Sequence, residues 1–176
     1  MQHVLRWSEG ISAYQSKFKD MDFEIPERCT HCGCGKFHKW GSYKRYVIEE
    51  EGEHEIHIQR IRCVKCGKTT SYLPSFCLSG ICYGLEFVIK ILKALLLKTR
   101  FSFGELRRRA YAFLRRFTQA ESLWLVFLRA GGFLDFPENG KDKRREIFTA
   151  LLKIHQSGDL LASFFQETGR HFMSTK

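Results

Sequence analysis

Two cysteine pairs with the same spacing constrain this sequence more than any other feature. Cys29 and Cys32 form the first pair in CTHCGC, and Cys63 and Cys66 form the second in CVKCGK. A glycine follows each pair directly, and thirty residues separate the two pairs. A CxxC turn aims two thiolates at one ion, and two such turns complete a tetrahedral site. The spacing predicts one structural zinc ion, with no coordination position left for water and therefore no catalytic role.

Another cysteine or a histidine is a possible replacement for one of the four cysteine ligands. Cys34 follows the first pair so closely that it offers a different pair of sulfurs, but 29/32 repeats the spacing of 63/66. Four histidines are possible substitutes: His31, His38, His54 and His57. A redox role is less favoured, because a thioredoxin-like CxxC needs a βαβ setting and no second copy. Cys77 and Cys82 are expected to be buried as small apolar side chains.

The composition limits the class of protein. The chain has 176 residues, 44% of them hydrophobic, which suffices for a core in one domain or two small ones. No run of about 18 apolar residues occurs, so neither a transmembrane helix nor a membrane partner is expected. The start MQHVLRWSEG lacks the pattern of a signal peptide. Seven cysteines, four of them in CxxC pairs, favour a reducing compartment, and we expect a cytoplasmic protein.

Hydrophobic patterns divide the chain into three parts. Residues 1–28 are expected to form an N-terminal helix, over 11–21, and an extended lead-in. Residues 29–80 are expected to form a four-cysteine zinc ribbon on a β-hairpin over 36–62. Residues 81–176 show helical periodicity. The predicted fold is therefore α+β and mainly α, a small β-hairpin zinc ribbon followed by a helical, partly helix-turn-helix-like domain.

Five helices are expected in the last part, over 84–98, 103–116, 119–130, 141–156 and 159–167. Capping boxes at Ser102–Glu105 and Thr118–Glu121 are predicted to start the second and third of them. The tight turn between these two helices resembles a helix-turn-helix. A helix that contacts base edges should be polar, whereas ESLWLVFLRA is nearly all apolar. We therefore expect the third helix to form core.

The positive charge is unevenly distributed along the chain. The net charge is +10, and residues 81–130 carry ten basic and three acidic side chains. The helix expected over 103–116 carries five arginines, of which Arg107 lies at the edge of the apolar stripe and four lie largely off it: Arg108, Arg109, Arg115 and Arg116. This excess favours a surface that faces a polyanion. The alternative is a solvated helix face with pairing between Glu105 and Arg109.

The hairpin supplies further basic candidates. Arg60 and Arg62 share one face of a strand, whereas the neighbours Lys44 and Arg45 point to opposite faces. We predict that these four residues and the five helical arginines contact nucleic acid, with DNA as the partner. RNA is the alternative, because small domains with exposed aromatic side chains also bind single strands.

Two stretches carry a resemblance to a known group of proteins. CTHCGCGKFHKWGSYKRYVI and IHIQRIRCVKCGKTTSYLPSF, within about residues 23–85, resemble the N-terminal zinc ribbons of bacterial insertion-element transposases and related mobile-element proteins. The shared features are C-x2-C-G, KWGSYKR, R-x-R-C-x2-C-G-K-T and a following Leu-Pro. In those proteins the ribbon precedes a helical DNA-binding region and often a DDE nuclease domain. The resemblance implies an accessory, targeting or regulatory DNA-binding role in a mobile element.

No enzymatic activity is expected. Fewer than a hundred residues follow Leu85, and their helical pattern leaves no strands to carry three metal-binding carboxylates. Solvated helix ends and loops account for the acidic residues there: Asp135, Asp142, Glu146 and Asp159. The competing function is a protein-interaction adaptor that docks on a transposase or polymerase subunit through the ribbon. Its interface would be formed by the phenylalanine-rich tail and the side chains of Trp40, Tyr43 and Tyr46.

Overall fold

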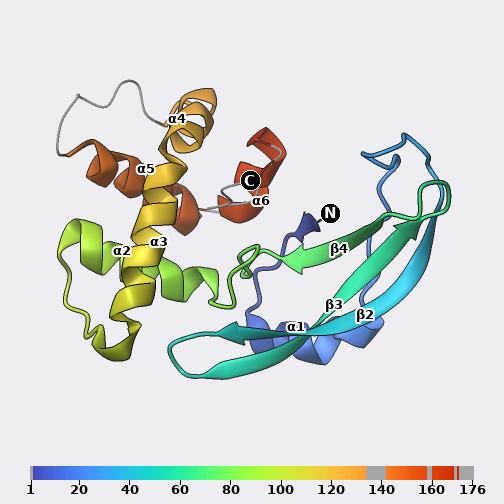
Figure 1. The fold of residues 1–176 in the computed structure, drawn as a ribbon, viewed down its shortest axis with the longest axis horizontal. Coiled ribbons are helices and arrows are strands. Elements are labelled where there is room, and N and C mark those ends of the chain that lie inside the picture. The colour runs from blue at the N-terminus through green and yellow to red at the C-terminus, as the bar shows by residue number, and fades with distance from the viewer. Residues whose placement is uncertain (1, 134–141, 158–159, 169, 171–176) are drawn as a thin grey trace.

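A computed structural model shows a sheet with a helical bundle at one end (Figure 1). The structure describes residues 2–133, 142–157, 160–168 and 170. In chain order the elements are β1 (Gln2–Leu5), α1 (Ile11–Lys17), a 3-10 turn η1 (Phe18–Asp20), β2 (Phe37–Ile48), β3 (Glu53–Cys63), β4 (Thr69–Pro74), α2 (Leu85–Leu97), a 3-10 turn η2 (Gly104–Leu106), α3 (Arg107–Gln119), α4 (Glu121–Ala130), α5 (Lys143–Ser157) and α6 (Leu160–Thr168).

The four strands form one mixed sheet in the order β1-β4-β3-β2. β1 is parallel to β4, whereas β4, β3 and β2 are antiparallel neighbours. The prediction of a small hairpin ribbon in a mainly α protein is therefore wrong, although the α+β class holds. A two-stranded hairpin alone is only marginally stable, and here β4 and β1 extend it into a sheet with buried side chains.

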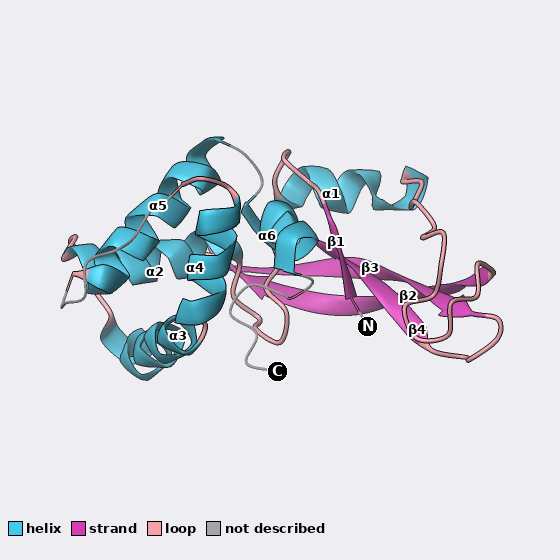
Figure 2. Ribbon diagram, turned by 90° about the horizontal axis from the view of Figure 1, so that it is seen from above, coloured by secondary structure: helices cyan, strands magenta, loops and turns pink. Residues whose placement is uncertain are grey.

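The β2–β3 hairpin is long and separates two ends of the molecule. Its eleven-residue strand β3 spans about 35 Å. Figures 1 and 2 show the hairpin turn beside the helical bundle and the opposite end of the strands far from it. A bulge interrupts β2, since Lys39 pairs with Ile61 and Ser42 with Gln59, which leaves Trp40 and Gly41 opposite a single residue. Gly41 has a φ of 69°, which a glycine adopts readily.

Helix α1 satisfies backbone groups along the edge of β3 that β4 leaves open. β4 pairs only with residues 60–62 of β3. Along the earlier part of β3, the Tyr14 hydroxyl donates to the His57 carbonyl at 2.9 Å, and the Gln15 amide donates to the Glu55 carbonyl at 2.8 Å. These bonds supply partners for carbonyls that a longer β4 would have paired.

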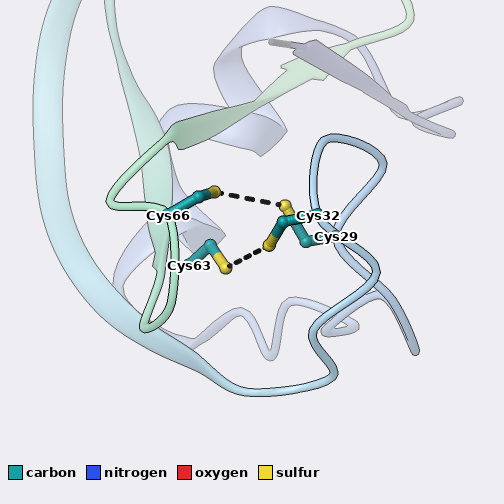
Figure 3. A group of neighbouring side chains, drawn as sticks. All are labelled: Cys29, Cys32, Cys63 and Cys66. Carbon is teal, nitrogen blue, oxygen red and sulfur yellow. Dashed lines mark hydrogen bonds between the residues drawn. The ribbon is translucent and has the colours of Figure 1, made fainter.

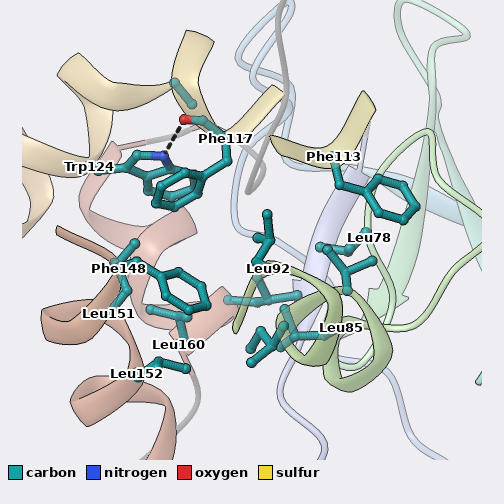
Figure 4. Packing of buried hydrophobic residues seen from close by; sticks show 14 of the residues in the cluster. Leu78, Leu85, Leu92, Phe113, Phe117, Trp124, Phe148, Leu151, Leu152 and Leu160 are labelled. Atoms are coloured by element: carbon teal, nitrogen blue, oxygen red, sulfur yellow. Dashed lines mark hydrogen bonds between the residues drawn. The ribbon is translucent and has the colours of Figure 1, made fainter. Parts of the chain in front are cut away.

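The helices enclose the largest hydrophobic cluster, which draws buried side chains from α2 through α6 (Figure 4). Trp124 belongs to this cluster, is fully buried, and donates its indole N–H to the Phe117 carbonyl at 2.9 Å. The expectation that the helix containing ESLWLVFLRA forms core is confirmed. Of the helices expected over 141–156 and 159–167, residues 141 and 159 lie outside the described residues.

Both predicted capping boxes are wrong. Thr118 lies inside α3, and Ala120, which makes no side-chain cap, connects α3 directly to α4. The start of α3 is continuous with η2, so Ser102 does not cap it either. The predicted stop at the glycine pair is confirmed, since Gly132 has a φ of 68° and Phe133 N–H bonds to Leu128 O at 2.8 Å. This pairing is a Schellman ending.

The hairpin turn is attached to the start of α2. Ile48 N–H donates to Cys82 O at 2.7 Å, and Gly84 N–H donates to Ile48 O at 3.0 Å. Gly84 occupies the N-cap of α2 and offers no side chain, but the Phe87 amide donates to the carboxylate of Glu49. A Cβ at Gly84 would clash with that carboxylate. Glu49 thus caps α2 from the hairpin, and we call these contacts the hairpin–helix junction.

The junction predicts a pH-dependent stability. Burial raises the pKa of Glu49 to about 7, and the charges of Glu86 and Glu51 also raise this pKa. The hydrogen bond from the Phe87 amide lowers the pKa, but by less than burial raises it. The folded state therefore favours the protonated carboxyl, and stability declines as the pH rises from the unfolded pKa through 7. We expect Glu49→Gln to match the wild type near pH 4.5 and to melt a few degrees higher at pH 7.5.

Thermal unfolding across that pH range measures the effect. Glu53→Gln changes an exposed carboxylate beside the same turn, one whose charge does not shift the pKa of Glu49, and serves as the matched control. A melting-temperature difference between Glu49→Gln and wild type that stays constant from pH 4.5 to pH 7.5 would contradict the buried-carboxyl assignment.

Candidate metal centre and basic surfaces

Four cysteine sulfurs converge (Figure 3) at the end of β3 that lies opposite the helical bundle (Figure 1). Cys29 and Cys32 lie in the loop before β2, Cys63 is the last residue of β3, and Cys66 lies in the turn that follows. The Sγ atoms of Cys29 and Cys66 are 3.7 Å apart, and those of Cys32 and Cys63 are 3.6 Å apart. All four sulfurs lie within 4.8 Å of one another.

The sulfur separations fit a metal site and do not fit disulfides. A tetrahedron with metal–sulfur distances of about 2.3 Å has edges of about 3.8 Å. A disulfide needs about 2.05 Å, and all four residues are free thiols. The four cysteines could therefore hold a metal ion.

The backbone around the two pairs is nearly the same. Gly33 N–H donates to Cys29 O at 2.7 Å, and Gly67 N–H donates to Cys63 O at 3.0 Å. Both glycines have positive φ, 70° and 68°, which explains why glycine follows each pair. The repeated CxxC-Gly sequence thus produces a repeated turn.

Backbone amides within each turn stabilise a thiolate at its first cysteine. The amides of His31 and Cys32 lower the pKa of Cys29. Those of Cys66 and Lys65 lower the pKa of Cys63 to about 6 despite burial. The amide of Cys34 likewise lowers the pKa of Cys32, but burial and the surrounding sulfurs outweigh it and raise the value to about 12. Four adjacent thiolates repel one another, so this donor set favours a bound cation.

The remaining cysteines and histidines lie outside this group. Within the described residues, the ligand atoms that converge are those of the four cysteines, without Cys34 or any histidine. Cys34 instead accepts a hydrogen bond from the Lys36 amide at 3.5 Å. Cys77 is buried as expected, whereas the expectation of burial is wrong for Cys82, which is exposed.

Two arginines of β3 stack on aromatic rings of β2. The Arg62 guanidinium lies 4.4 Å from the ring centroid of Trp40, and its Nε donates to Gly67 O at 3.1 Å. The Arg60 guanidinium lies 5.6 Å from the ring centroid of Tyr43. The two arginines share a face, as the strand alternation predicted.

Lys44 and Arg45 do not join that surface. Lys44 forms an ion pair with Glu55 at 2.8 Å. Arg45 turns toward the hairpin–helix junction, where its Nη2 donates to the carbonyls of Leu78 at 2.5 Å and Ile81 at 2.8 Å. Two loop carbonyls therefore already bind the guanidinium of Arg45, and its contact with nucleic acid stays a prediction.

The arginines of α3 fall on two sides of the helix. Ala110, Phe113 and Phe117 are buried, and at 100° per residue Arg108 and Arg115 lie opposite them, with Arg107 beside this exposed face. Arg107, Arg108 and Arg115 are exposed, together with Tyr111, whose exposed fraction is 54%. We call these four residues the α3 basic face. The aromatic member went unnoticed in the sequence, although its position four residues from both Arg107 and Arg115 could have revealed it.

Arg109 and Arg116 lie on the adjacent side of α3. Arg109 donates to the Tyr83 hydroxyl and stacks 5.3 Å from the centroid of that ring. Among the described residues Glu105 forms no ion pair with Arg109, so the predicted pairing is absent. The guanidinium of Arg109 therefore contributes to packing against the loop before α2.

The acidic residues of the helical half supply no grouped carboxylates within the described residues. Asp142 pairs with Arg145 at 3.4 Å near the start of α5, and Glu146 follows one turn later in that helix. Asp135 and Asp159 lie outside the described residues.

Residues 28–104 match the model of a domain of unknown function, DUF6431. The matched region contains both CxxC pairs, the hairpin, β4, α2 and the start of η2. No curated protein and no solved structure matches the chain. In the part of the chain that the structure describes, no helix is both long enough and apolar enough to cross a bilayer.

Proposed function

We propose that this chain is a DNA-binding protein whose four cysteines hold one structural zinc ion. Four thiolates in tetrahedral positions suit zinc or iron, and zinc is the common structural ion for two CxxC pairs. A saturated site of four thiolates has no position for water or substrate, so the ion fixes the backbone of the loop and turn around it. The proposal includes no catalytic step.

The α3 basic face is the observation that carries the DNA-binding proposal. Arg107, Arg108 and Arg115 project away from the core, and in the described part of the chain none of them forms an ion pair. Arginine suits phosphate because its planar fork bonds two oxygens at once. Arg60 and Arg62 on the hairpin add a second basic surface.

A titration of metal-loaded protein with a duplex over a range of salt concentrations tests the proposal. If about five phosphates are neutralised, the log–log slope of affinity against salt should be near −4 to −5. A slope near zero, or no binding at low salt, would refute it. The proposed role as an accessory, targeting or regulatory factor of a mobile element rests on the sequence resemblance to transposase N-terminal regions.

The second candidate is a protein-interaction adaptor. Trp40 and Tyr46 have exposed fractions of 45% and 51%, and aromatic side chains of this kind often anchor protein interfaces. Duplex binding that depends on salt favours the DNA-binding function. A protein that does not bind duplex at low salt favours the adaptor function.

A further inference from the structure

The hairpin is strongly polarised in charge. Residues 28–43 and 56–85 contain no aspartate or glutamate, and up to Lys68 these segments carry seven basic side chains. The acidic residues of the hairpin cluster at its turn, near the helices: Glu49, Glu50, Glu51, Glu53 and Glu55. The end with the four cysteines is therefore basic, and it retains a positive balance when four thiolates and a divalent ion are counted.

At this basic end, the described residues leave one face of the sheet more exposed than the other, and Trp40 lies on that face. Nearer the helices, Tyr14 of α1 packs over Ile56 and Ile58. At the metal end, Phe23 of the lead-in packs against Ile61, which points to the other face of β3. The acidic side chains Asp22, Glu24 and Glu27 flank this Phe23 contact in the sequence.

This face carries two aromatic–arginine pairs, in which Trp40 is exposed and Tyr43 is half-buried against the cluster around Tyr14. Trp40 with Arg62 and Tyr43 with Arg60 lie side by side, because Arg60 and Arg62 are two residues apart on one strand, about 7 Å. The bulge at Trp40 and Gly41 sets the tryptophan opposite Arg60, and the residue remains 45% exposed while Arg62 stacks on its ring. We call Trp40, Tyr43, Arg60 and Arg62 the aromatic–arginine face.

We propose that the aromatic–arginine face binds single-stranded nucleic acid by stacking a base on Trp40 while the arginines contact the backbone phosphates. Every base has a π face, and stacking on a protein ring contributes substantially to single-strand binding. In a duplex the bases stack on one another and are not accessible to such a ring. This inference rests on the proposed nucleic-acid function and adds a strand preference to one of its surfaces.

Binding of oligonucleotides to the full, metal-loaded chain tests the inference. The probes are single-stranded oligo(dU) and oligo(rU) of about 20 nucleotides, longer than a typical single-strand site, and a mixed-sequence duplex of equal length. Trp40→Ala should weaken binding of the single strands about tenfold and duplex binding little. Trp40→Phe should retain most of the affinity, because a phenyl ring also stacks. A difference between the two single strands would show whether the 2′-hydroxyl is read.

Tyr46→Ala is the matched control, since Tyr46 is an equally exposed aromatic residue on the opposite face of β2. Tyr46→Ala should change single-strand affinity by less than about twofold, because Tyr46 is expected to contribute almost no base stacking. Equal losses for Trp40→Ala and Tyr46→Ala, or none for Trp40→Ala, would overturn the inference. Duplex binding without single-strand binding would overturn this inference alone, whereas absence of both would overturn the proposed function as well. Capture of an acidic peptide in place of either nucleic acid would assign the face to a protein partner.

Discussion

Cys63→Ser is expected to remove the metal from the purified protein and to lower its melting temperature by about 10 °C or more. Cys63 is 1% exposed and is the last residue of β3, where its thiolate joins the hairpin to the turn that carries Cys66. Without the ion nothing links the three remaining thiol groups, and the loop before β2 loses this attachment to the sheet. Hydrogen exchange should accelerate most in residues 28–37 and 61–70 and less in α2 and α3.

Elemental analysis after extensive dialysis measures the metal directly and separates zinc from iron. The expected result is one zinc ion per wild-type chain and none in the variant. Cys34→Ser is the control, because Cys34 is a neighbouring thiol outside the group of four. A Cys34→Ser protein that loses its metal, or a Cys63→Ser protein that keeps it, would show that the ligand set is wrong.

Replacing Arg107, Arg108 and Arg115 together with alanine is expected to weaken duplex binding at low salt about a hundredfold or more. Each lost phosphate contact removes about 0.9 from the salt slope, so the slope should flatten by about 2 to 3. The melting temperature should change little, because the three side chains point away from Ala110 and Phe113 into solvent.

A variant with the same loss of charge elsewhere separates a local surface from a general effect. Lys17, Lys19 and Lys153 are exposed and lie far along the sequence from α3, so their combined change to alanine serves this purpose. Equal losses in both triple variants would mean that net charge alone drives binding. An unchanged affinity in the arginine variant would favour the adaptor function.

The metal centre was predictable because its signal is local. A CxxC-Gly repeat specifies the turn that points two thiolates at an ion, and the same turn occurs at Gly33 and Gly67. The hairpin and the long helices were also predictable, since their periodicity lies within short windows. The four cysteines of the site could therefore be named before the fold was known.

The sheet was not predictable in the same way. β1 has only four residues and pairs with β4, about seventy positions later, in a parallel register from Gln2 to Ser71. Pattern within a short window carries no information on such a partner. The capping boxes failed for a related reason, because α3 continues through Thr118 where core packing of Phe117 and Trp124 stabilises another turn of helix.

The roles of the individual arginines were also undetermined by sequence. Alternation placed Arg45 and Arg60 on strand faces, but it could not reveal the carbonyls of Leu78 and Ile81 opposite Arg45. Nor could it reveal the tyrosine ring under Arg109. Charge counts indicate a basic surface, whereas the partners of each guanidinium depend on loops that the chain brings in from elsewhere.

The hairpin–helix junction has a geometric consequence. Hydrogen bonds of Arg45, Ile48 and Glu49 join the turn of the hairpin to the helical bundle. The hairpin therefore has a fixed direction relative to the helices. The metal end and α3 are then separated by a distance on the order of the length of the hairpin, about 35 Å. At about 3.4 Å per base pair, one nucleic acid molecule touching both would have to extend over roughly ten base pairs. If the proposed nucleic-acid function holds, the length of β2 and β3 would set the minimum length of a ligand that reaches both surfaces.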